Sequence, residues 1–294
     1  MSATIWKSEE ARARLEEWHE RFADRITVPL EKHFVETSFG RNLVLTGGPE
    51  SSLPLVCLHA MRTGSAHLLS ELGPLLERFR IIAPDLPNQS VYGPQIKVPL
   101  NDDSLAQWLL EVLDGFGIEK VYLFGVSWGG FIARQIATVA PERVEKLVLL
   151  VPAGIVNGSH WVGLTRMAIP MLKYRFWPTE KNLRAFLDPL LTTWDEHWAQ
   201  FMGESLNDMA FNFEIPPLAS DAELRQIQSP TLVLGADNDI SFPGEKLVKR
   251  AQLLIPNCDV EVIADCKHCP PTTEEFRLWL ADRVIRFLNQ DGLS

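Results

Sequence analysis

Five short runs of this sequence are mainly apolar, and helix-like stretches separate them. The runs are FRIIAPD (79–85), KVYLFGV (120–126), KLVLLVP (146–152), PTLVLGA (230–236) and DVEVIAD (259–265). Strands that are covered by helices on both faces are apolar in this continuous way, whereas half-exposed strands alternate. Alternation of such strands with helices predicts a mostly parallel sheet with right-handed crossovers. The chain is therefore expected to be an α/β protein.

The first part of the chain follows a different pattern. Residues 8–26 are charged with a sparse apolar stripe, which predicts an amphipathic helix on the outside of the domain. Three β-rich runs follow at 32–39, 41–47 and 53–59, and FGRN (39–42) is typical of a hairpin turn.

One interval interrupts the alternation of strands and helices. About 80 residues between Val151 and Pro230 contain no convincing strand but many Trp, Phe and Met side chains. A simple crossover needs far less chain. We therefore expect residues 153–220 to form a helical insertion over one end of the sheet, with its aromatic content buried. The core would then comprise residues 1–152 and 221–294.

A serine lies at the point where one apolar run becomes a helix-like run. Residues 125–129 read Gly-Val-Ser-Trp-Gly, which fits the pattern G-x-S-x-G. This pattern holds a serine in a turn so sharp that the neighbours two residues away must lack side chains. Functional groups of parallel sheets gather beyond the carboxyl ends of the strands, and the following helix N-terminus would stabilise a developing oxyanion. The position favours Ser127 as a nucleophile over an ordinary turn.

A serine nucleophile needs a base to take its proton and an acid to orient that base. Of the seven histidines, His268 is the candidate base, because it follows the last strand run in a short loop before the final helix. The loop DNDISFP, which follows PTLVLGA, offers Asp237 and Asp239 as the acid. Most loop aspartates only face solvent, but one of these two must face His268 if Ser127 is catalytic.

Together these segments resemble the α/β-hydrolase superfamily and, within it, the capped carboxylesterases. The resemblance runs from about residue 32 to 290 and rests on LVCLHAM, IIAPDLPNQS, GVSWGG, PTLVLGADNDISFP and DCKHCP. The chain order Ser, Asp, His is also the order expected for that fold. The resemblance implies an α/β-hydrolase fold with a helical cap at 153–220. It also implies a serine hydrolase that cleaves esters of apolar acyl or aryl groups through an acyl-enzyme, without a cofactor.

Three residues of this chain match the family's catalytic positions. The resemblance implies Ser127 as the nucleophile, His268 as the general base and Asp239 as the acid. It favours Asp239 over Asp237 because the family's acid usually stands four residues before a proline, here Pro243.

The segment LHAM (58–61) matches the family's oxyanion loop. The resemblance implies that the backbone N–H groups of Met61 and Trp128 hold the oxyanion, whereas His59 has a structural role. Ala60 stands where the family usually has glycine, and alanine tolerates fewer backbone angles.

Three other enzyme or binding functions compete with this interpretation. Ser-Trp-Gly is also found in proline iminopeptidase-like peptidases, which need cap carboxylates to hold a substrate amine, and the insertion offers Glu180, Asp188, Glu204 and Glu214. C–C bond hydrolases of aromatic degradation are a second rival. The third is a ligand-binding protein that has the hydrolase fold but no activity.

Cysteines flank the candidate base as Cys266-Lys267-His268-Cys269. A zinc site needs four ligands, and only the distant Cys258 could add a thiolate. A redox C-x-x-C usually opens a helix in another fold context. We therefore expect these cysteines to be packing residues and the chain to hold no metal.

Composition and charge restrict the partners and the compartment. A formal net charge of −10 argues against nucleic acid and anionic membranes, and no window approaches the roughly 18 apolar residues of a membrane span. The N-terminus lacks a signal-peptide core, and four cysteines do not make a disulfide framework. We expect a cytoplasmic enzyme whose partner is a small apolar ester, and the sequence leaves a homo-oligomer open.

Overall fold

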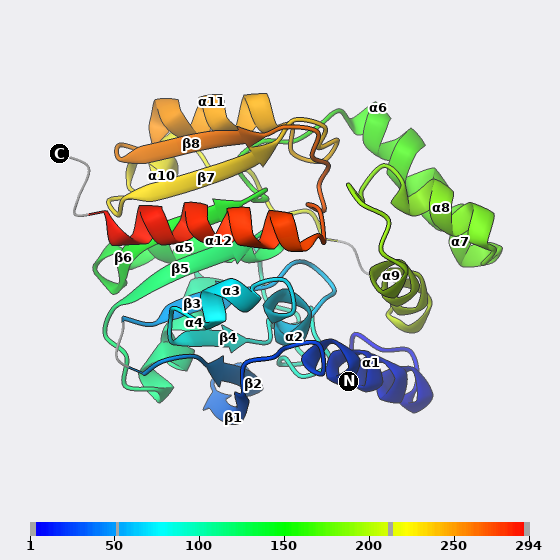
Figure 1. Cartoon of the computed structure of the whole chain (residues 1–294), viewed down its shortest axis with the longest axis horizontal. Helices are drawn as coiled ribbons and strands as arrows, with labels where there is room; N and C mark the ends of the chain where they lie inside the picture. The colour runs from blue at the N-terminus through cyan, green and yellow to red at the C-terminus, as the bar shows by residue number, and fades with distance from the viewer. Residues whose placement is uncertain (1–3, 51–52, 211–213, 291–294) are drawn as a thin grey trace.

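The computed structural model describes residues 4–50, 53–210 and 214–290, and these build a three-layer α/β fold around one eight-stranded sheet (Figure 1). The strands are β1 (Leu30–Thr37), β2 (Gly40–Gly47), β3 (Leu55–Leu58), β4 (Ile81–Pro84), β5 (Val121–Val126), β6 (Val144–Leu150), β7 (Thr231–Ala236) and β8 (Cys258–Ile263). Their order is β1-β2-β4-β3-β5-β6-β7-β8. β2 runs antiparallel to β1 and β4, and the pairs from β4 to β8 are parallel. The predicted fold class is confirmed.

Helices lie on both faces of the sheet and, in the chain between β6 and β7, also beyond one end of it (Figure 1). They are α1 (Glu9–Ala23), α2 (Ser65–Leu69), α3 (Gly73–Leu76), α4 (Ser104–Gly115), α5 (Trp128–Val139), α6 (His160–Gly163), α7 (Ile169–Phe176), α8 (Glu180–Leu187), α9 (Glu196–Asp208), α10 (Asp221–Arg225), α11 (Gly244–Leu254) and α12 (Glu274–Asn289). A 3₁₀ turn lies at Pro141–Arg143 and a π-helical turn at Leu164–Ala168.

The hydrophobic core has one cluster on each face of the sheet, and successive strand residues alternate between them. In β3, Val56 and Leu58 belong to the cluster under α4 and α5, whereas Leu55 and Cys57 belong to the cluster under α2 and α12. All four side chains are fully buried. Burial on both faces is the reason that β4 to β7 read as apolar runs. The prediction fails for the run at 259–265, because β8 is an edge strand in which only Ile263 is buried.

The N-terminal elements differ slightly from their predicted bounds. α1 begins after Ser8, whose side chain caps the helix by accepting the Ala11 N–H, and it packs on α2 and α9. In the β1–β2 hairpin, Thr37 pairs with Gly40, so the turn lies at 38–39 and not at FGRN (39–42). A two-residue turn suits the twist of an antiparallel pair, and Gly40 supplies the positive φ of 120° beside it.

The chain between β6 and β7 carries the helices α6 to α10, of which α6, α7 and α8 protrude beyond the sheet (Figure 1). The predicted insertion also includes residues 211–213, which lie outside the described residues. It has its own small core, formed by Tyr174, Phe186, Leu187, Leu190, Leu191, Ala199 and Leu206.

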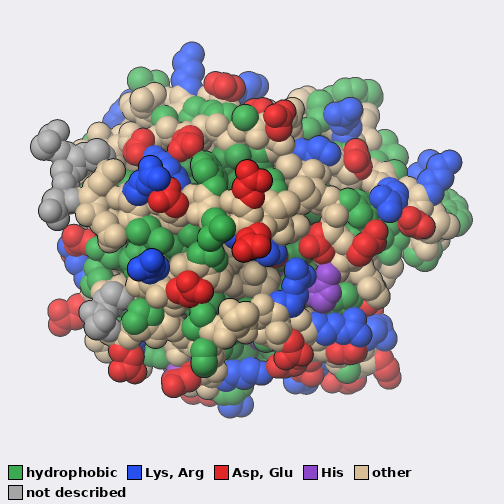
Figure 2. Space-filling model, viewed as in Figure 1, with side chains coloured by type: hydrophobic (Ala, Val, Ile, Leu, Met, Phe, Trp, Pro, Cys, Tyr) green, Lys and Arg blue, Asp and Glu red, His purple; other side chains and the backbone are tan. Residues whose placement is uncertain are grey.

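The aromatic residues of the insertion are only partly buried, contrary to expectation. Trp161, Phe176 and Trp177 are 71%, 69% and 64% exposed, and hydrophobic side chains show on the surface over α6 and α7 (Figure 2). α7 packs on α8 and α9, but Tyr174 is its only buried residue, and Ile169, Leu172 and Phe176 are exposed. Within the described residues, no helix has the length and hydropathy to cross a membrane.

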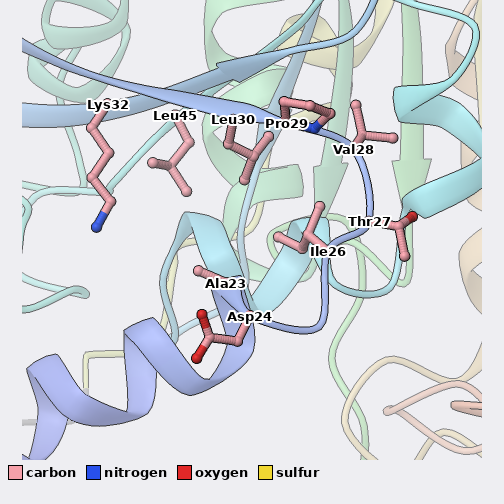
Figure 3. A pocket seen from close by; sticks show the side chains of 9 residues that line it. All are labelled: Ala23, Asp24, Ile26, Thr27, Val28, Pro29, Leu30, Lys32 and Leu45. Carbon is pink, nitrogen blue, oxygen red and sulfur yellow. The ribbon is translucent and has the colours of Figure 1, made fainter.

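A surface pocket of about 260 Å³ lies where the link after α1 meets β1 and β2 (Figure 3). Its walls are mainly apolar, with Ile26, Val28 and Leu30 among them, and Asp24 and Lys32 at its rim. None of its lining residues comes from the loops beyond the carboxyl ends of β5, β7 and β8. This pocket is therefore separate from the edge of the sheet where the predicted site residues lie.

Candidate active site

Ser127 occupies a one-residue turn between β5 and α5. Its φ of 50° and ψ of −109° match the first central position of a type II′ turn, which normally requires glycine. The Ser127 N–H donates to the Leu150 carbonyl at 3.0 Å, and the Ser127 carbonyl accepts from the Ala153 N–H at 3.0 Å. The turn is therefore held by the end of β6, and it places the serine beyond the carboxyl edge of the sheet.

The two glycines of the motif allow the backbone to pass very close to its neighbours. A Cβ atom on Gly129 would lie 2.1 Å from the Leu58 carbonyl oxygen, and one on Gly125 would lie 2.6 Å from the Gly129 oxygen. Both contacts involve backbone atoms, which cannot rotate away. The glycines are therefore required for α5 to begin directly beside the end of β3.

His268 and Asp239 lie in line with this serine. The distance from Ser127 Oγ to His268 Nε2 is 3.1 Å, and the distance from His268 Nδ1 to Asp239 Oδ2 is 2.8 Å. His268 comes from the loop after β8 and Asp239 from the loop after β7. The structure thus brings together the three side chains that the sequence singled out, from the ends of three parallel strands.

Asp239 is buried and accepts three hydrogen bonds. Besides His268, the N–H groups of Ser241 and Phe242 donate to its Oδ1 atom at 2.7 and 3.0 Å. Burial alone would raise the pKa of Asp239, but the charge and hydrogen bond of His268 and the two backbone N–H groups outweigh burial and lower it. Asp239 is therefore held ionised.

The contact between Asp239 and His268 raises the pKa of His268, whereas it lowers that of Asp239. Burial disfavours the imidazolium and would lower the pKa of His268, whereas the Asp239 charge and hydrogen bond raise it, and the net pKa is raised. Because the carboxylate only accepts, Nδ1 carries the proton, and Nε2 is left to accept the Ser127 hydroxyl proton.

Asp237, the alternative acid, does not contact His268 but anchors its loop. Its carboxylate accepts the N–H groups of Asp265 and Cys266, each at 2.9 Å. These bonds join the loop after β7 to the loop after β8, and Asp265 adopts a positive φ of 52° there. From the sequence, Asp237 was interpreted either as the catalytic acid or as a solvent-exposed residue. Its role in joining two loops leaves no pattern in the sequence around it.

The loop after β3 lies against the start of α5, because β3 and β5 are parallel neighbours and Leu58 pairs with Gly125. Met61 is 37% exposed, and Trp128 is the buried first residue of α5. Among the described residues, neither the Met61 nor the Trp128 backbone N–H donates a hydrogen bond within the protein. Ala60 does not have a positive φ, so the replacement of glycine introduces no backbone strain at this position.

His59 and Thr63 shape this loop. His59 Nδ1 donates to the Ala60 carbonyl at 2.8 Å, and its Nε2 accepts the Leu86 N–H at 2.9 Å. Thr63 Oγ1 also donates to the Ala60 carbonyl at 2.8 Å. Burial lowers the pKa of His59, so the ring is neutral and can accept as well as donate. These contacts of His59 are with backbone groups of its own loop and of the segment after β4, and they fit the structural role that the resemblance implies.

Asp85, at the end of β4, is a buried carboxylate that sequence reasoning missed. Its Oδ2 accepts the Ser65 hydroxyl at 2.6 Å, its Oδ1 accepts from Ser90 Oγ, and His19 and His59 lie within 4 Å. Burial would raise the pKa of Asp85, but the neighbouring His19 imidazole, with His59 and the hydrogen bond from Ser65, outweighs burial and lowers it well below its usual range. The network fixes the base of the loop that carries Met61.

The cysteines near His268 are free thiols. Burial raises the pKa of Cys266 to about 11 and that of Cys269 to about 12, so neither is a thiolate at neutral pH. Within the part of the chain that the structure describes, no group of three or more His, Cys, Asp or Glu side chains is arranged to hold a metal ion.

Comparisons with known proteins identify relatives along most of the chain. The family model of the alpha/beta hydrolase fold matches residues 54–274. The uncharacterized carboxylesterase nap of Bacillus subtilis (strain 168) is 26% identical over 274 residues, which cover 91% of this chain and 90% of that protein. A 2-hydroxy-6-oxononadienedioate/2-hydroxy-6-oxononatrienedioate hydrolase of Pseudomonas putida is 28% identical over 238 residues, 74% of this chain and 82% of its own length.

Solved structures show the same fold. The naproxen esterase (carboxylesterase NP) from Bacillus subtilis superposes with a TM-score of 0.77 at 22% sequence identity, and the match covers 94% of this chain and 98% of that one.

Proposed function

Since this chain belongs to the α/β-hydrolase fold family, we propose that it is a serine hydrolase that cleaves carboxylic esters of apolar acyl or aryl groups. The observation that carries the proposal is the line of hydrogen bonds from Ser127 through His268 to Asp239. A hydroxyl beside an imidazole that a carboxylate orients is activated for attack on a carbonyl carbon. The similarity to proteins named carboxylesterases supports the ester as the substrate.

In the proposed reaction, Ser127 Oγ attacks the ester carbonyl while its proton passes to Nε2 of His268. The bond to the leaving alcohol then breaks, and the imidazolium gives that proton to the alcohol oxygen. Water next loses a proton to His268 and attacks the acyl-enzyme, and the proton returns to Ser127 as the acid leaves. Asp239 stays ionised and holds the imidazole in the required tautomer. These steps use no cofactor.

The backbone N–H groups of Met61 and Trp128 are the proposed oxyanion donors. Trp128 follows Ser127 directly as the first residue of α5, and Met61 belongs to the loop after β3, whose last residue Leu58 pairs with Gly125 of β5. Neither is used within the described part of the protein, so both can donate to a substrate oxygen. The N-terminus of α5 adds the positive end of a twelve-residue helix.

We propose that residues 153–220 act as a lid that selects the substrate. The segment leaves the sheet at the carboxyl end of β6, next to the Ser127 turn. Met167, in the π-helical turn, accepts a hydrogen bond from Ser241 Oγ at 3.6 Å, two residues beyond Asp239. Lid side chains therefore reach the rim of the site, and apolar lid residues favour apolar esters by about 0.8 kcal/mol for each methylene that they bury.

The peptidase alternative requires lid carboxylates that are free to hold a substrate amine. Glu180 pairs with Arg184, and Glu204 accepts the Trp18 indole N–H at 2.8 Å. Glu214 is the partner of Lys97, and Asp188 lies 3.9 Å from Lys267. The contacts of Glu204 and Glu214 favour the ester over the aminoacyl substrate. Glu180 and Asp188 are 77% and 81% exposed, and their ion pairs are correspondingly weak.

A substrate panel tests the proposal directly. The protein should hydrolyse p-nitrophenyl esters of short to medium acyl chains, react with a fluorophosphonate probe at Ser127, and leave aminoacyl-nitroanilides intact. A 2-hydroxy-6-oxo-dienoate belongs in the same panel, because the Pseudomonas putida relative is named as a hydrolase of such compounds. Faster turnover of the dienoate than of any ester would favour C–C bond hydrolysis. Absence of both labelling and turnover would favour a binding protein.

Ser127→Ala is the control for the panel, because it removes the nucleophile and leaves the lid unchanged. To test the lid, Met167→Ala should change the relative rates on acetate and octanoate esters more than it changes the rate on acetate. An unchanged chain-length profile for Met167→Ala and for further substitutions across 153–220 would refute the lid proposal.

We also propose that the enzyme works in the cytoplasm. The four cysteines are free thiols in the structure, and three of them have a pKa raised by burial to about 11 or 12. Thiols that pair with no neighbour suit a reducing compartment. Fractionation of the producing cells, followed by fluorophosphonate labelling, would reveal any other location.

A further inference from the structure

The loop that carries His268, residues 264–272, is held from two sides. On the side of β7, Asp237 accepts the N–H groups of Asp265 and Cys266. The other side is held by residues 188–193, which link α8 and α9 in the middle of the insertion. The proposed base therefore lies between the core and the proposed lid.

One side chain of this lid segment bonds to the backbone of both residues that flank His268. The Thr192 hydroxyl accepts the Lys267 N–H at 2.8 Å and donates to the Cys269 carbonyl at 2.8 Å. The Cys266 sulfur is 3.8 Å from the same hydroxyl. Because a hydroxyl has only one proton, Thr192 donates it to the much closer Cys269 carbonyl and not to the sulfur.

Backbone hydrogen bonds align the two segments around this contact. The Cys269 N–H donates to the Leu190 carbonyl at 2.9 Å, and the Thr192 N–H donates to the Cys269 carbonyl at 3.1 Å. Leu191 and Cys269 form an isolated parallel bridge. Three residues beyond Cys269, the Thr272 N–H donates to Thr193 Oγ1 at 3.1 Å.

We propose that Thr192 is a positioning residue for His268, and that the lid supplies part of the scaffold of the catalytic base. The inference rests on the proposed function of Ser127 and His268. By joining the N–H before His268 to the carbonyl after it, one hydroxyl fixes the local backbone curvature. That curvature keeps the imidazole 2.8 Å from Asp239 and 3.1 Å from Ser127.

Three variants separate this role from general packing. Thr192→Val keeps the shape of the side chain and removes the hydroxyl, so the Lys267 N–H loses its acceptor. Thr192→Ser keeps the hydroxyl and loses only a methyl group. Thr193→Val is the matched control, because it removes a hydroxyl from the same lid segment that bonds to Thr272 and not to the residues flanking His268.

The expected result is a loss of turnover without a loss of binding. Thr192→Val should lower kcat on a p-nitrophenyl ester by about 10- to 100-fold, because small misplacements of reacting groups have effects of that size, while KM stays within about twofold. Thr192→Ser should restore turnover, and Thr193→Val should resemble the wild type. Loosening the contact with Asp239 should also move the acidic limb of the kcat/KM profile to lower pH in Thr192→Val alone.

Several outcomes would overturn the proposal. Wild-type kcat and pH profile in Thr192→Val would show that the hydroxyl does not position the base, and equal losses in Thr192→Ser would assign the effect to packing of the methyl group. Equal losses in Thr193→Val would assign it to the segment as a whole. If Thr192→Val does not fold, Thr192→Ala, which adds no bulk, takes its place with the same expectations.

A readout without substrate keeps this test separate from the proposed function. NMR titration of the His268 imidazole measures its pKa in each variant, whether or not esters are cleaved. A pKa lowered in Thr192→Val and unchanged in Thr193→Val supports positioning even if the substrate class is wrong. An unchanged pKa in Thr192→Val, with active wild-type enzyme, would reject positioning and leave the hydrolase assignment intact.

Discussion

Replacing Asp239 by asparagine should reverse the tautomer of His268. In the structure, one carboxylate oxygen accepts the N–H groups of Ser241 and Phe242, and the other accepts His268 Nδ1–H. An asparagine has one acceptor oxygen, and the two backbone donors require it. The amide NH₂ group must then face Nδ1, which can accept this bond only by giving up its proton.

The size of the effect follows from where the imidazole proton goes. With Nδ1 as acceptor, the neutral ring carries its proton on Nε2, which faces Ser127 at 3.1 Å and can no longer take the hydroxyl proton. The wrong tautomer lowers kcat by about 10⁴-fold in serine hydrolases, which corresponds to about 5.4 kcal/mol at 1.36 kcal/mol for each factor of ten. The fold should change little, because every hydrogen bond of Asp239 can be replaced.

Asp237→Asn is the matched control, because the same chemical change is made two residues away in the same loop. Its carboxylate accepts the Asp265 and Cys266 N–H groups, and an amide can accept only one of them well. We expect a loss of about 1–3 kcal/mol in the free energy of unfolding and a loss of turnover below about tenfold. Steady-state kcat on a p-nitrophenyl ester and thermal melting would measure both.

Two results would refute this reasoning. If Asp239→Asn kept more than about a tenth of wild-type kcat, far above the expected 10⁻⁴, the carboxylate would not set the tautomer. If Asp237→Asn were the more damaged variant in turnover, the acid would be assigned wrongly.

Further predictions concern the rest of the site. Ser127→Ala should lower hydrolysis by about 10⁴-fold or more without altering the melting curve. The pKa of His268 is raised, and only the neutral imidazole can act as a base. Wild-type kcat/KM should therefore rise with pH around a midpoint above the ordinary pKa of histidine. A midpoint below the ordinary pKa would contradict the contact with Asp239. Gly129→Ala should impair folding and activity together, because its Cβ would meet the Leu58 oxygen at 2.1 Å, and a fully active variant would refute that packing. Cys266→Ser with Cys269→Ser should retain most activity, and chelators should have no effect; a large loss with EDTA would point to a metal.

The strands and the loops beyond them were predictable because each leaves a local pattern. Burial on both faces makes strands such as β5 and β7 continuously apolar, and the ends of these runs locate the edge of the sheet. The turn at Ser127 needs glycines at positions 125 and 129, and this spacing is a recognisable motif in the sequence. His268 and Asp239 follow from that edge, although the choice between Asp239 and Asp237 needed the family resemblance.

Contacts between distant segments leave no such pattern. Thr192 is 75 residues before Lys267 in the chain, and nothing around it distinguishes it from Thr193. Asp85 reads as an ordinary residue at the end of a strand, yet it is buried between side chains from three other segments. The partners of both residues are set by how the elements pack, which the sequence around each residue does not encode.

The burial of individual aromatic residues in the insertion likewise could not be predicted from the sequence around each residue. Composition predicts that large apolar side chains are buried, but the side of a helix that packs decides which ones are. Trp198 packs against Phe22 of α1, with ring centroids 4.6 Å apart, whereas Trp161 lies on the outward side of α6. The sequence therefore shows which residues are apolar but not which of them face a packed neighbour.

The backbone of Ser127 sets stability and catalysis against each other. A residue other than glycine at a positive φ costs on the order of 1–3 kcal/mol, and glycine's extra freedom in the unfolded chain costs only about 0.5–1 kcal/mol. With φ at 50° and ψ at −109°, this position would hold glycine more comfortably than serine. A glycine variant should therefore melt at a higher temperature and cleave nothing. Selecting variants of this chain for thermal stability alone would select against the proposed nucleophile.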